Sequence, residues 1–390
     1  MAKPLPTRAD LIDYNYAVAG HDGTLCDVDG ELFIKPCTPA EIAFYESSVA
    51  SHPSFAEFMP TFLGTLTLDE QTNGTSTSIE EAGAALLAKH NGTSIEEASA
   101  TILAAEEASA AILFNGSDTN GTAILSNGTN TPIEIITNGV PRAKHAIPST
   151  EPPIKTGKRI ITNLAVVLEN AAHGFIKPNI LDVKLGVRLW ADDAPLEKQI
   201  RFDKVTSETT HKDLGFRVAG MRVWQGGKRE GEDVDEEGYK VFNKDYGRFD
   251  LHTGNVHEAF TNFLFSEKAG VDEELGKLVA QAFLADLEKI EAVLAGQESR
   301  MFSASLLFVF EGDGKALRTA MEEASSPSTM VNGDEEDEDE DEDEVPVPKI
   351  YTVKVIDFAH AEWVPGQGPD ENALLGVRSV SKILENIVAA

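Results

Sequence analysis

Two short strings of the sequence place chemically active side chains beside apolar runs. The first is Pro178–Gly186, which reads PNILDVKLG. In an extended strand, Asp182 and Lys184 point to the same face, whereas Leu181 and Val183 point to the opposite face, into a core. A carboxylate can hold hydroxyl groups or a metal, and a lysine beside it can meet a transferring phosphoryl group. The alternative that the spacing leaves open is a salt-bridged strand on a solvated face.

The second string is Ile356-Asp357-Phe358-Ala359-His360, in which an acidic residue directly follows an apolar strand. A strand end presents a carboxylate rigidly, and Mg²⁺ prefers oxygen ligands. Asp357 is therefore a candidate magnesium ligand, and His360 is a candidate substrate-binding residue. An ordinary surface position is the alternative for both residues.

A third pair of charged residues lies near the N-terminus. Lys35 ends a predicted strand, and the helix predicted after it contains Glu41. This is the order of the strand lysine and helix glutamate that hold nucleotide phosphates in protein kinases. The chain contains no G-x-x-x-x-G-K-[ST] string, and the stretch 366–371 lacks the last glycine of G-x-G-x-x-G. The P-loop and dinucleotide-binding classes are therefore disfavoured.

The elements that must position these residues follow from periodicity and turn chemistry. Asp29-Gly30 predicts a turn in a hairpin over 25–35, and apolar residues at helical spacing predict helices over 41–50, 271–294 and 370–388. The β-rich runs 305–310 and 351–356 lie on either side of an acidic stretch. We expect these two runs to pair as a hairpin with a long loop.

Composition limits the classes of function. With 33 Lys and Arg against 65 Asp and Glu, the net charge is −32, which disfavours direct nucleic-acid binding. Two cysteines are too few for a disulfide scaffold or a cysteine-rich zinc site. The first residues lack the apolar stretch of a signal peptide, and no apolar run is long enough to predict a membrane span. We therefore expect a soluble protein of a reducing compartment.

Two stretches of biased composition divide the chain. The stretch 65–160 contains a single aromatic residue and is rich in small and polar residues, which predicts a disordered insertion. The stretch 314–349 contains the unbroken acidic run Asp334–Glu344 and is predicted to be an extended, disordered loop. The remaining segments are 1–64, the first part of an N-terminal lobe; 161–313, a hinge strand and a C-terminal lobe; and 350–390, a metal-binding strand and a terminal helix.

The string Pro178-x-x-x-Asp182-x-Lys184-x-Gly186 resembles the signature of the inositol polyphosphate kinases. Within that family the chain most resembles the fungal inositol polyphosphate multikinases, some of which carry an acidic tract at the same place. Further segments match the family's motifs in the family's order: Ala19-Gly20-His21, Phe44-Tyr45-Glu46, Pro60-x-x-x-Gly64, Leu168-Glu169-Asn170, Leu214–Arg222, Tyr246-Gly247-Arg248, Ser305–Gly312, Ile356–His360 and Gly368–Asn372.

The resemblance implies a two-lobed α+β fold, distantly similar to that of protein kinases, with two low-complexity insertions and with ATP in the cleft. Lys35 would hold the nucleotide phosphates. Glu169 and the backbone of Ala171 would form the hinge that reads the adenine edge. Asp182 would hold the ribose and has a catalytic role in some relatives.

The resemblance also implies the residues around the transferred phosphoryl group. Lys184 would be catalytic and would bridge the γ-phosphate and the acceptor. Asp357 would bind Mg²⁺, with Ser305 as a second candidate ligand, although the family's double serine is Ala304-Ser305 in this chain. The residues expected to bind the inositol phosphate are Lys184, Lys198, Arg201, Lys204 and His360.

The implied activity is ATP- and Mg²⁺-dependent phosphorylation of inositol trisphosphate to tetrakis- and pentakisphosphates. The alternatives within the class are an inositol hexakisphosphate kinase and an inositol trisphosphate 3-kinase. A different class is an acidic nuclear scaffold that binds basic or transcription-related proteins through the acidic run. Because the multikinases are often nuclear, the expected location is the nucleus and the cytoplasm.

Overall fold

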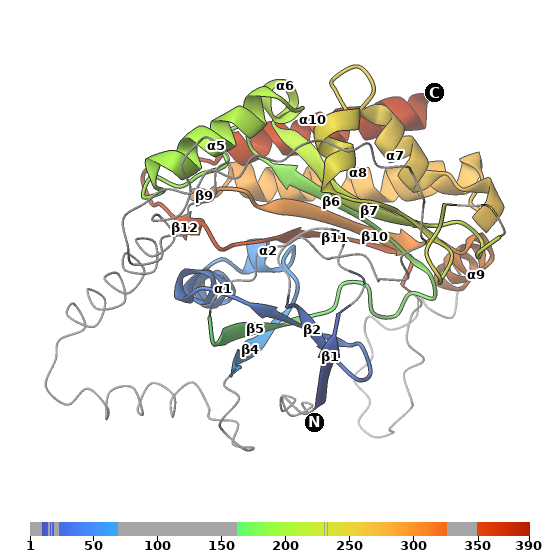
Figure 1. Cartoon of the computed structure of the whole chain (residues 1–390), viewed down its shortest axis with the longest axis horizontal. Coiled ribbons are helices and arrows are strands. Elements are labelled where there is room, and N and C mark those ends of the chain that lie inside the picture. The colour runs from blue at the N-terminus through green and yellow to red at the C-terminus, as the bar shows by residue number, and fades with distance from the viewer. Residues whose placement is uncertain are drawn as a thin grey trace, which may run out of the picture. The chain divides into compact units, whose positions relative to one another are not determined.

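The computed structural model describes residues 10–14, 16, 18, 23–68, 162–229, 231, 233–325 and 349–390. The predicted insertion lies outside the described residues from position 69 onward, and so does the acidic run. The described part of the chain consists of two five-stranded sheets, one two-stranded sheet and the helices packed on them (Figure 1). Within it, no helix combines the length and the apolar character needed to cross a membrane.

The N-terminal sheet has the strand order β1-β2-β3-β5-β4 and is antiparallel throughout. The predicted hairpin is confirmed, since β2 pairs with β3 and Gly30 takes a positive φ of 72° in the turn between them. Helix α1 begins at the cap residue Thr38, whose side chain accepts a hydrogen bond from the Glu41 backbone N–H. The strands are β1 (Leu11–Asp13), β2 (Leu25–Asp27), β3 (Leu32–Pro36), β4 (Phe62–Thr67) and β5 (Leu164–Glu169), and the helices are α1 (Pro39–Ser51) and α2 (Pro53–Ala56).

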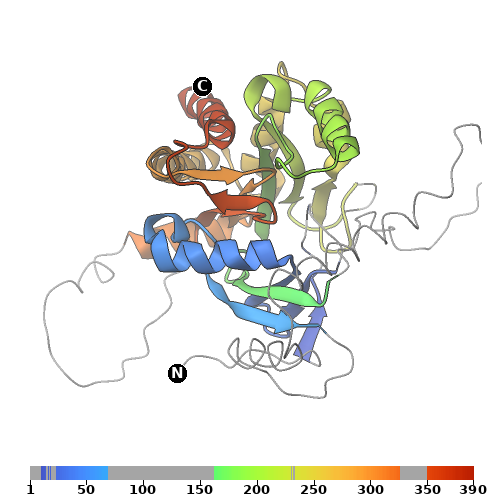
Figure 2. The ribbon, with the colours of Figure 1, turned by 90° about the vertical axis from the view of Figure 1, so that its left-hand side faces the viewer.

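The larger sheet has the order β11-β10-β6-β7-β8, so that β6, which carries Asp182 and Lys184, lies at its centre. Strands β10 and β11 form the predicted antiparallel hairpin, with Ser305 opposite Ile356. Helices α7, α8 and α10 cover one face of this sheet (Figures 1 and 2). The elements are β6 (Pro178–Leu185), β7 (Phe216–Trp224), β8 (Tyr239–Phe242), β10 (Ser305–Glu311), β11 (Tyr351–Ile356), α7 (His257–Leu264), α8 (Glu273–Ala295) and α10 (Glu371–Ala389).

The two long predicted helices are confirmed, together with the side chains that begin them. Asp272 accepts a hydrogen bond from the Leu275 N–H at the start of α8, and Asp370 accepts one from the Ala373 N–H at the start of α10. The remaining elements connect these parts: α5 (Leu196–Ser207), α6 (His211–Leu214), η2 (Tyr246–Asp250), η3 (Glu267–Ala269), β9 (Ser299–Met301), α9 (Gly314–Ala324) and β12 (Ala361–Trp363).

The structure corrects the predicted edges of both biased stretches. Residues 65–67 belong to β4, where Leu66 packs on the core of the N-terminal sheet, so the insertion does not begin at 65. Residues 314–324 form helix α9 rather than part of a disordered loop. Asp313 caps this helix and Leu317 is fully buried, and these local contacts outweigh the polar composition that the sequence shows there.

Candidate active site

The central strand β6 presents its predicted catalytic residues on the face of the large sheet that helices α7, α8 and α10 leave uncovered. Asp182 lies in register between Gly220 of β7 and Leu307 of β10, and Lys184 lies between Arg217 and Ser305. Leu181 and Val183 point the other way and are fully buried in the main core. The predicted alternation along this strand is therefore confirmed.

A cavity opens on the Asp182 face and is lined by both sheets and by Tyr14, Tyr16 and Val18. It encloses about 810 Å³ of empty space, including open space at its mouth. Apolar side chains form much of the wall, and the charged residues that line the cavity are Lys35, Glu169, Asp182 and Asp357.

Asp357 joins two lysines that come from different sheets. Lys35 Nζ lies 2.9 Å from Asp357 Oδ1 and 2.7 Å from Glu41 Oε1, and Lys184 Nζ lies 3.3 Å from Asp357 Oδ2. The strand lysine Lys35 and the helix glutamate Glu41, which the sequence places in this order, thus form an ion pair. Burial opposes ionisation of Asp357, but the ammonium groups of Lys35 and Lys184 hold the pKa of Asp357 well below its usual range. The carboxylate therefore stays ionised.

Aromatic packing and backbone geometry fix Asp357 in place. The next residue, Phe358, is fully buried, and its ring centroid lies 4.9 Å from that of Phe44 and 5.2 Å from that of Tyr45. Asp357 itself has a φ of 69°, and so does not have the backbone of an ordinary strand residue. Ser303 shares this feature with a φ of 62°, and its carbonyl accepts a hydrogen bond from Lys184 Nζ at 2.7 Å. Strained backbone of this kind clusters at functional sites.

Asp182 is buried beside this network and is only 4% exposed. Burial raises the pKa of Asp182 to about 6, while Lys184 opposes the shift and Asp357 adds to it. Its Oδ1 atom has no hydrogen-bonding partner among the described residues. A buried carboxylate oxygen without a donor is suited to accept hydroxyl protons of a ligand. The alternative of a salt-bridged, solvated strand is wrong, since Lys184 pairs with Asp357 and Asp182 is buried.

The predicted hinge follows β5 and lines the cavity through Glu169, Asn170 and Ala171. The Glu169 carboxylate is already occupied, because it accepts hydrogen bonds from Thr61 Oγ1 at 2.9 Å and from Lys349 Nζ at 3.2 Å. These bonds lower the pKa of Glu169 against the opposing effect of its partial burial. The Ala171 N–H has no acceptor among the described residues, so the hinge backbone is the part of this segment that can meet a ligand.

The predicted substrate-binding residues gather around helix α5, outside the cavity wall. Lys198 Nζ lies 3.0 Å from His360 Nε2, which brings α5 to the turn after β11. Burial lowers the pKa of Lys198, against the opposing charge of Asp193. Arg201 and Lys204 are exposed on the same helix, and Lys204 Nζ lies 3.8 Å from Glu208 Oε1. The structure therefore brings Lys198 and His360 together and leaves the other two basic side chains on the helix surface.

Arg217 is a charged residue of this site that the sequence motifs do not indicate. It lies opposite Lys184 in the pairing of β6 and β7, and its Nη1 donates to the Lys244 carbonyl oxygen at 3.2 Å. Burial lowers the pKa of Arg217, and the neighbouring charge of Asp182 opposes that shift. The matched segment 214–222 contains this arginine, but only the strand pairing shows that it neighbours Lys184.

Comparison with known proteins decides the family of this chain. Residues 165–385, more than half of the chain, match the family described as inositol polyphosphate kinase. The chain belongs to the inositol polyphosphate kinase family. The resemblance drawn from the motifs is therefore confirmed.

The relatives differ in how much of the chain they match. An inositol polyphosphate multikinase of Saccharomyces cerevisiae is 30% identical over 94% of this chain and 96% of its own length. A second, of Schizosaccharomyces pombe, is 29% identical over 56% of this chain and 67% of its own length. Human inositol hexakisphosphate kinase 1 is 30% identical over 57% of this chain but only 52% of its own.

A solved structure confirms the predicted fold of the inositol polyphosphate kinase family. It is the crystal structure of an inositol phosphate multikinase from S. cerevisiae in complex with ADP and Mn²⁺. The superposition covers 92% of this chain and 99% of that one, with a TM-score of 0.53 and 24% sequence identity. The two sheets described above are thus the two lobes of the family's fold.

Proposed function

We propose that this inositol polyphosphate kinase is a multikinase that uses ATP and Mg²⁺ to phosphorylate ring hydroxyls of inositol tris- and tetrakisphosphates. The observation that carries the proposal is the convergence of Lys35, Asp182, Lys184 and Asp357 beside one cavity. The match to a multikinase over almost the whole of both chains supports it further.

The donor set fits Mg²⁺. Asp357 places its carboxylate at the cavity wall, and hard oxygen ligands of this kind are those that Mg²⁺ takes in phosphoryl-transfer sites. Ser305 is less well supported as a ligand, because its side chain is fully buried and it does not line the cavity. When bound, Mg²⁺ would neutralise charge on the nucleotide phosphates.

The protein's own residues would divide the remaining work. Lys35 would hold the nucleotide phosphates while Glu41 keeps its ammonium group in place. Asp182 would accept hydrogen bonds from the ribose hydroxyls, and the hinge backbone at Ala171 would form hydrogen bonds with the edge of the adenine ring. Lys184 would follow the negative charge from the γ-phosphate to the acceptor, since its Nζ is fixed by the Ser303 carbonyl and Asp357.

The acceptor would bind along helix α5. Lys198, Arg201 and Lys204 offer three positive charges on one helix, and His360 contacts the first of them. An inositol polyphosphate carries several negative charges, whereas this chain has a net charge of −32. Attraction between the basic side chains of α5 and the phosphates can still outweigh repulsion by distant acidic residues, because salt screens charges beyond about 8 Å at physiological ionic strength.

A nuclear role through the acidic run is a second proposal. The run Asp334–Glu344 would bind basic, transcription-related proteins, and the protein would then act in the nucleus as well as in the cytoplasm. In cells, Lys184→Ala separates the two roles. Cellular functions that persist in this variant, although phosphorylation is lost, would depend on protein binding by the acidic run. Loss of all functions would show that they depend on kinase activity.

A substrate panel tests the proposed activity. Inositol tris-, tetrakis- and hexakisphosphates are each incubated with Mg²⁺ and γ-labelled ATP, and the products are separated. We expect label in tetrakis- and pentakisphosphates, and loss of that label in Lys184→Met. Lys277→Met removes a lysine of an exposed helical ion pair on α8 and is the matched control. Label only in products of the hexakisphosphate, or only in inositol tetrakisphosphate, would identify one of the two alternative kinases instead.

A further inference from the structure

A short segment near the N-terminus contacts both sheets and forms part of the cavity wall. Tyr14 belongs to the N-terminal sheet, since its N–H donates to the Thr24 carbonyl oxygen at 3.0 Å and its hydroxyl lies 3.3 Å from Asn170 Oδ1. Tyr16 and Val18, which follow, also line the cavity. Tyr14 therefore lies on the hinge side of the cavity, whereas Val18 lies beside the large sheet.

The large sheet receives this segment at a glycine. A Cβ atom added to Gly220 of β7 would lie 2.0 Å from the carbonyl oxygen of Val18, so any side chain there would collide with backbone. Gly220 pairs with Asp182 of β6, which places the contact directly beside the buried carboxylate of the site. The close approach of Val18 to Gly220 thus sets the distance between Val18 and β7, the strand next to β6.

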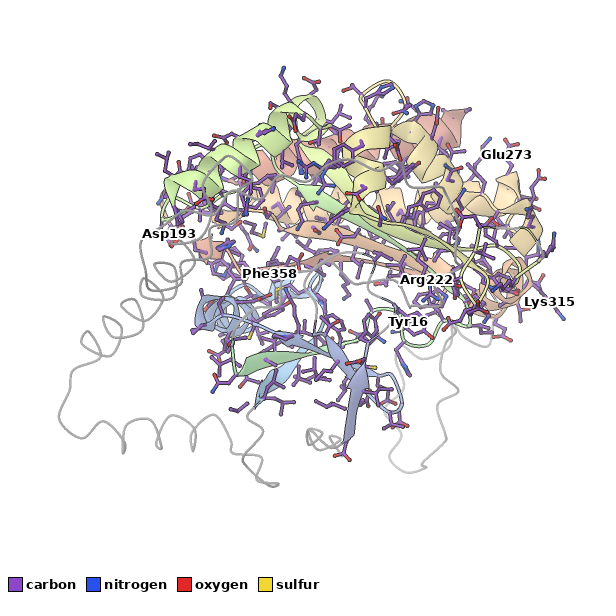
Figure 3. The ribbon with its side chains drawn as sticks, viewed as in Figure 1. Tyr16, Asp193, Arg222, Glu273, Lys315 and Phe358 are labelled. Atoms are coloured by element: carbon purple, nitrogen blue, oxygen red, sulfur yellow. The ribbon has the colours of Figure 1, made fainter. Side chains whose placement is uncertain are left out.

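Arg222, two residues further along β7, binds the same segment through its guanidinium group. The guanidinium carbon lies 4.7 Å from the ring centroid of Tyr16 and 3.9 Å from that of Tyr239 (Figure 3). Nη2 donates to Asp235 Oδ2 at 2.9 Å and to Glu237 Oε2 at 2.8 Å. The residue is only 5% exposed, and its cation is held between two rings and two carboxylates.

The partners of Arg222 are themselves fixed. Asp235 Oδ1 accepts hydrogen bonds from the backbone N–H groups of Glu237 at 3.0 Å and Tyr239 at 2.9 Å. Nε and Nη1 of Arg222 have no hydrogen-bonding partner among the described residues, so the plane of the guanidinium is set by the stacked rings and the two carboxylates. Lysine lacks a planar group and cannot reproduce this arrangement.

We propose that Arg222 is a positioning residue that latches Tyr16 and Val18 onto β7 and thereby fixes one wall of the nucleotide cavity. This inference rests on the proposed function, which assigns the cavity to ATP. Arg222 pairs in register with Ile180 of β6, and Ile180 lines the same cavity. Loss of the latch would let the wall move while Lys35, Lys184 and Asp357, held by their own contacts, stay in place.

The latch predicts a selective effect on nucleotide binding. Arg222→Lys should raise the KM for ATP and the Kd for ADP about tenfold, as expected for loss of a desolvated cation–π contact. The kcat and the KM for the inositol phosphate should change less than about twofold. This change is smaller than the effect that loss of one contact of this size could produce. Tyr16→Leu should give the same pattern, whereas Tyr16→Phe keeps the ring and should resemble the wild type. A general structural defect would instead lower kcat and raise both KM values.

The experiment measures ADP binding by isothermal titration calorimetry and steady-state kinetics on the full chain, with thermal unfolding as a check of folding. In a double-mutant cycle, Arg222→Lys combined with Tyr16→Leu should bind ADP no more weakly than either single variant. Additive losses, or wild-type affinity in Arg222→Lys or in Tyr16→Leu, would overturn the latch. Absence of ADP binding by the wild-type protein would instead overturn the proposed function.

Discussion

Lys35 Nζ lies 2.9 Å from Asp357 Oδ1, although the two residues are 322 positions apart in the chain. Lys35 belongs to β3 of the N-terminal sheet, and Asp357 directly follows β11 of the large sheet. This ion pair therefore joins the two lobes at the cavity. Lys184 contacts the same carboxylate. In the proposed function, binding of nucleotide and metal would exchange these contacts for lysine–phosphate and carboxylate–metal contacts.

Removal of the Asp357 charge should stop turnover. Asp357→Asn should lower kcat at least about a hundredfold, in the range seen when one electrostatic group of an active site is lost. The variant also leaves two partly buried ammonium groups without their shared partner, which costs about 3 kcal/mol of unfolding free energy. The measurements are kcat at saturating ATP and Mg²⁺ and unfolding in urea. Asp286→Asn, in an ion pair with Lys289 on α8, is the control, and near-normal kcat in a folded Asp357→Asn would contradict the metal assignment.

Asp182 should make both stability and activity depend on pH. Its pKa is raised from 3.8 to about 6 in the folded protein, so the stabilisation it provides is full below pH 3.8 and is lost as the pH rises through 6. Asp182→Asn should therefore be more stable than the wild type by roughly 3 kcal/mol at pH 8, and the difference should shrink toward pH 4. Urea unfolding across this range measures the difference.

The same variant links that pKa to binding. If ionised Asp182 accepts the ribose hydroxyls, kcat/KM for ATP in the wild type should rise with pH through about 6. Asp182→Asn should lose this rise and have a higher KM for ATP above pH 6, where Asp182 of the wild type is ionised. An unchanged profile in the variant would mean that another group titrates.

The strand-borne residues of the site could be predicted from the sequence because alternation and motif order are local properties. The two-residue period of a strand is enough to predict that Asp182 and Lys184 share one face. The order of a strand followed by a helix is enough to predict the pairing of Lys35 with Glu41. The roles of Arg217 and Arg222 could not be predicted in this way, because they depend on the register between β6 and β7. Helix α9 was missed for a related reason, since the burial of Leu317 is a tertiary contact that composition does not show.

Asn372 should control the loop that leads from β6 to helix α5. Its Oδ1 accepts hydrogen bonds from the N–H groups of Val187 at 2.8 Å and Arg188 at 2.9 Å, and its Nδ2 donates to the Arg188 carbonyl oxygen at 3.0 Å. Asn372→Ala leaves these backbone groups unpaired and should cost about 2 kcal/mol of stability. Because α5 carries the proposed acceptor site, the KM for the inositol phosphate should rise and the KM for ATP should not.

The matched control for this prediction is Asn386→Ala, an exposed position on the same helix α10. Thermal unfolding and separate KM measurements for the two substrates distinguish the effects. An equal rise of both KM values in Asn372→Ala would argue against a role confined to the acceptor side.

Gly220→Ala should reproduce the effect of losing Arg222. The new methyl group would meet the Val18 carbonyl oxygen at 2.0 Å, so the segment that lines the cavity must move away from β7. We expect a higher KM for ATP, measured at saturating inositol phosphate, with the chain still folded. Gly296→Ala is the control, since its added Cβ would have its nearest neighbour at 3.4 Å and its φ is −89°. Unaltered ATP binding in Gly220→Ala would show that the contact at Val18 does not set the cavity wall.

The long insertion should be dispensable, because the two strands that flank it are already paired. Strand β4 pairs antiparallel with β5 up to Thr67 opposite Leu164, and the Leu68 N–H donates to the Asn163 carbonyl oxygen at 2.6 Å. Replacing 69–162 by Asn-Gly would close this pair with a two-residue hairpin turn. Kinetic constants for both substrates should stay within about threefold of the wild type, and the unfolding free energy should not fall, since a shorter loop costs less closure entropy. A folded deletion variant with a large loss of kcat would mean that the insertion contributes to catalysis.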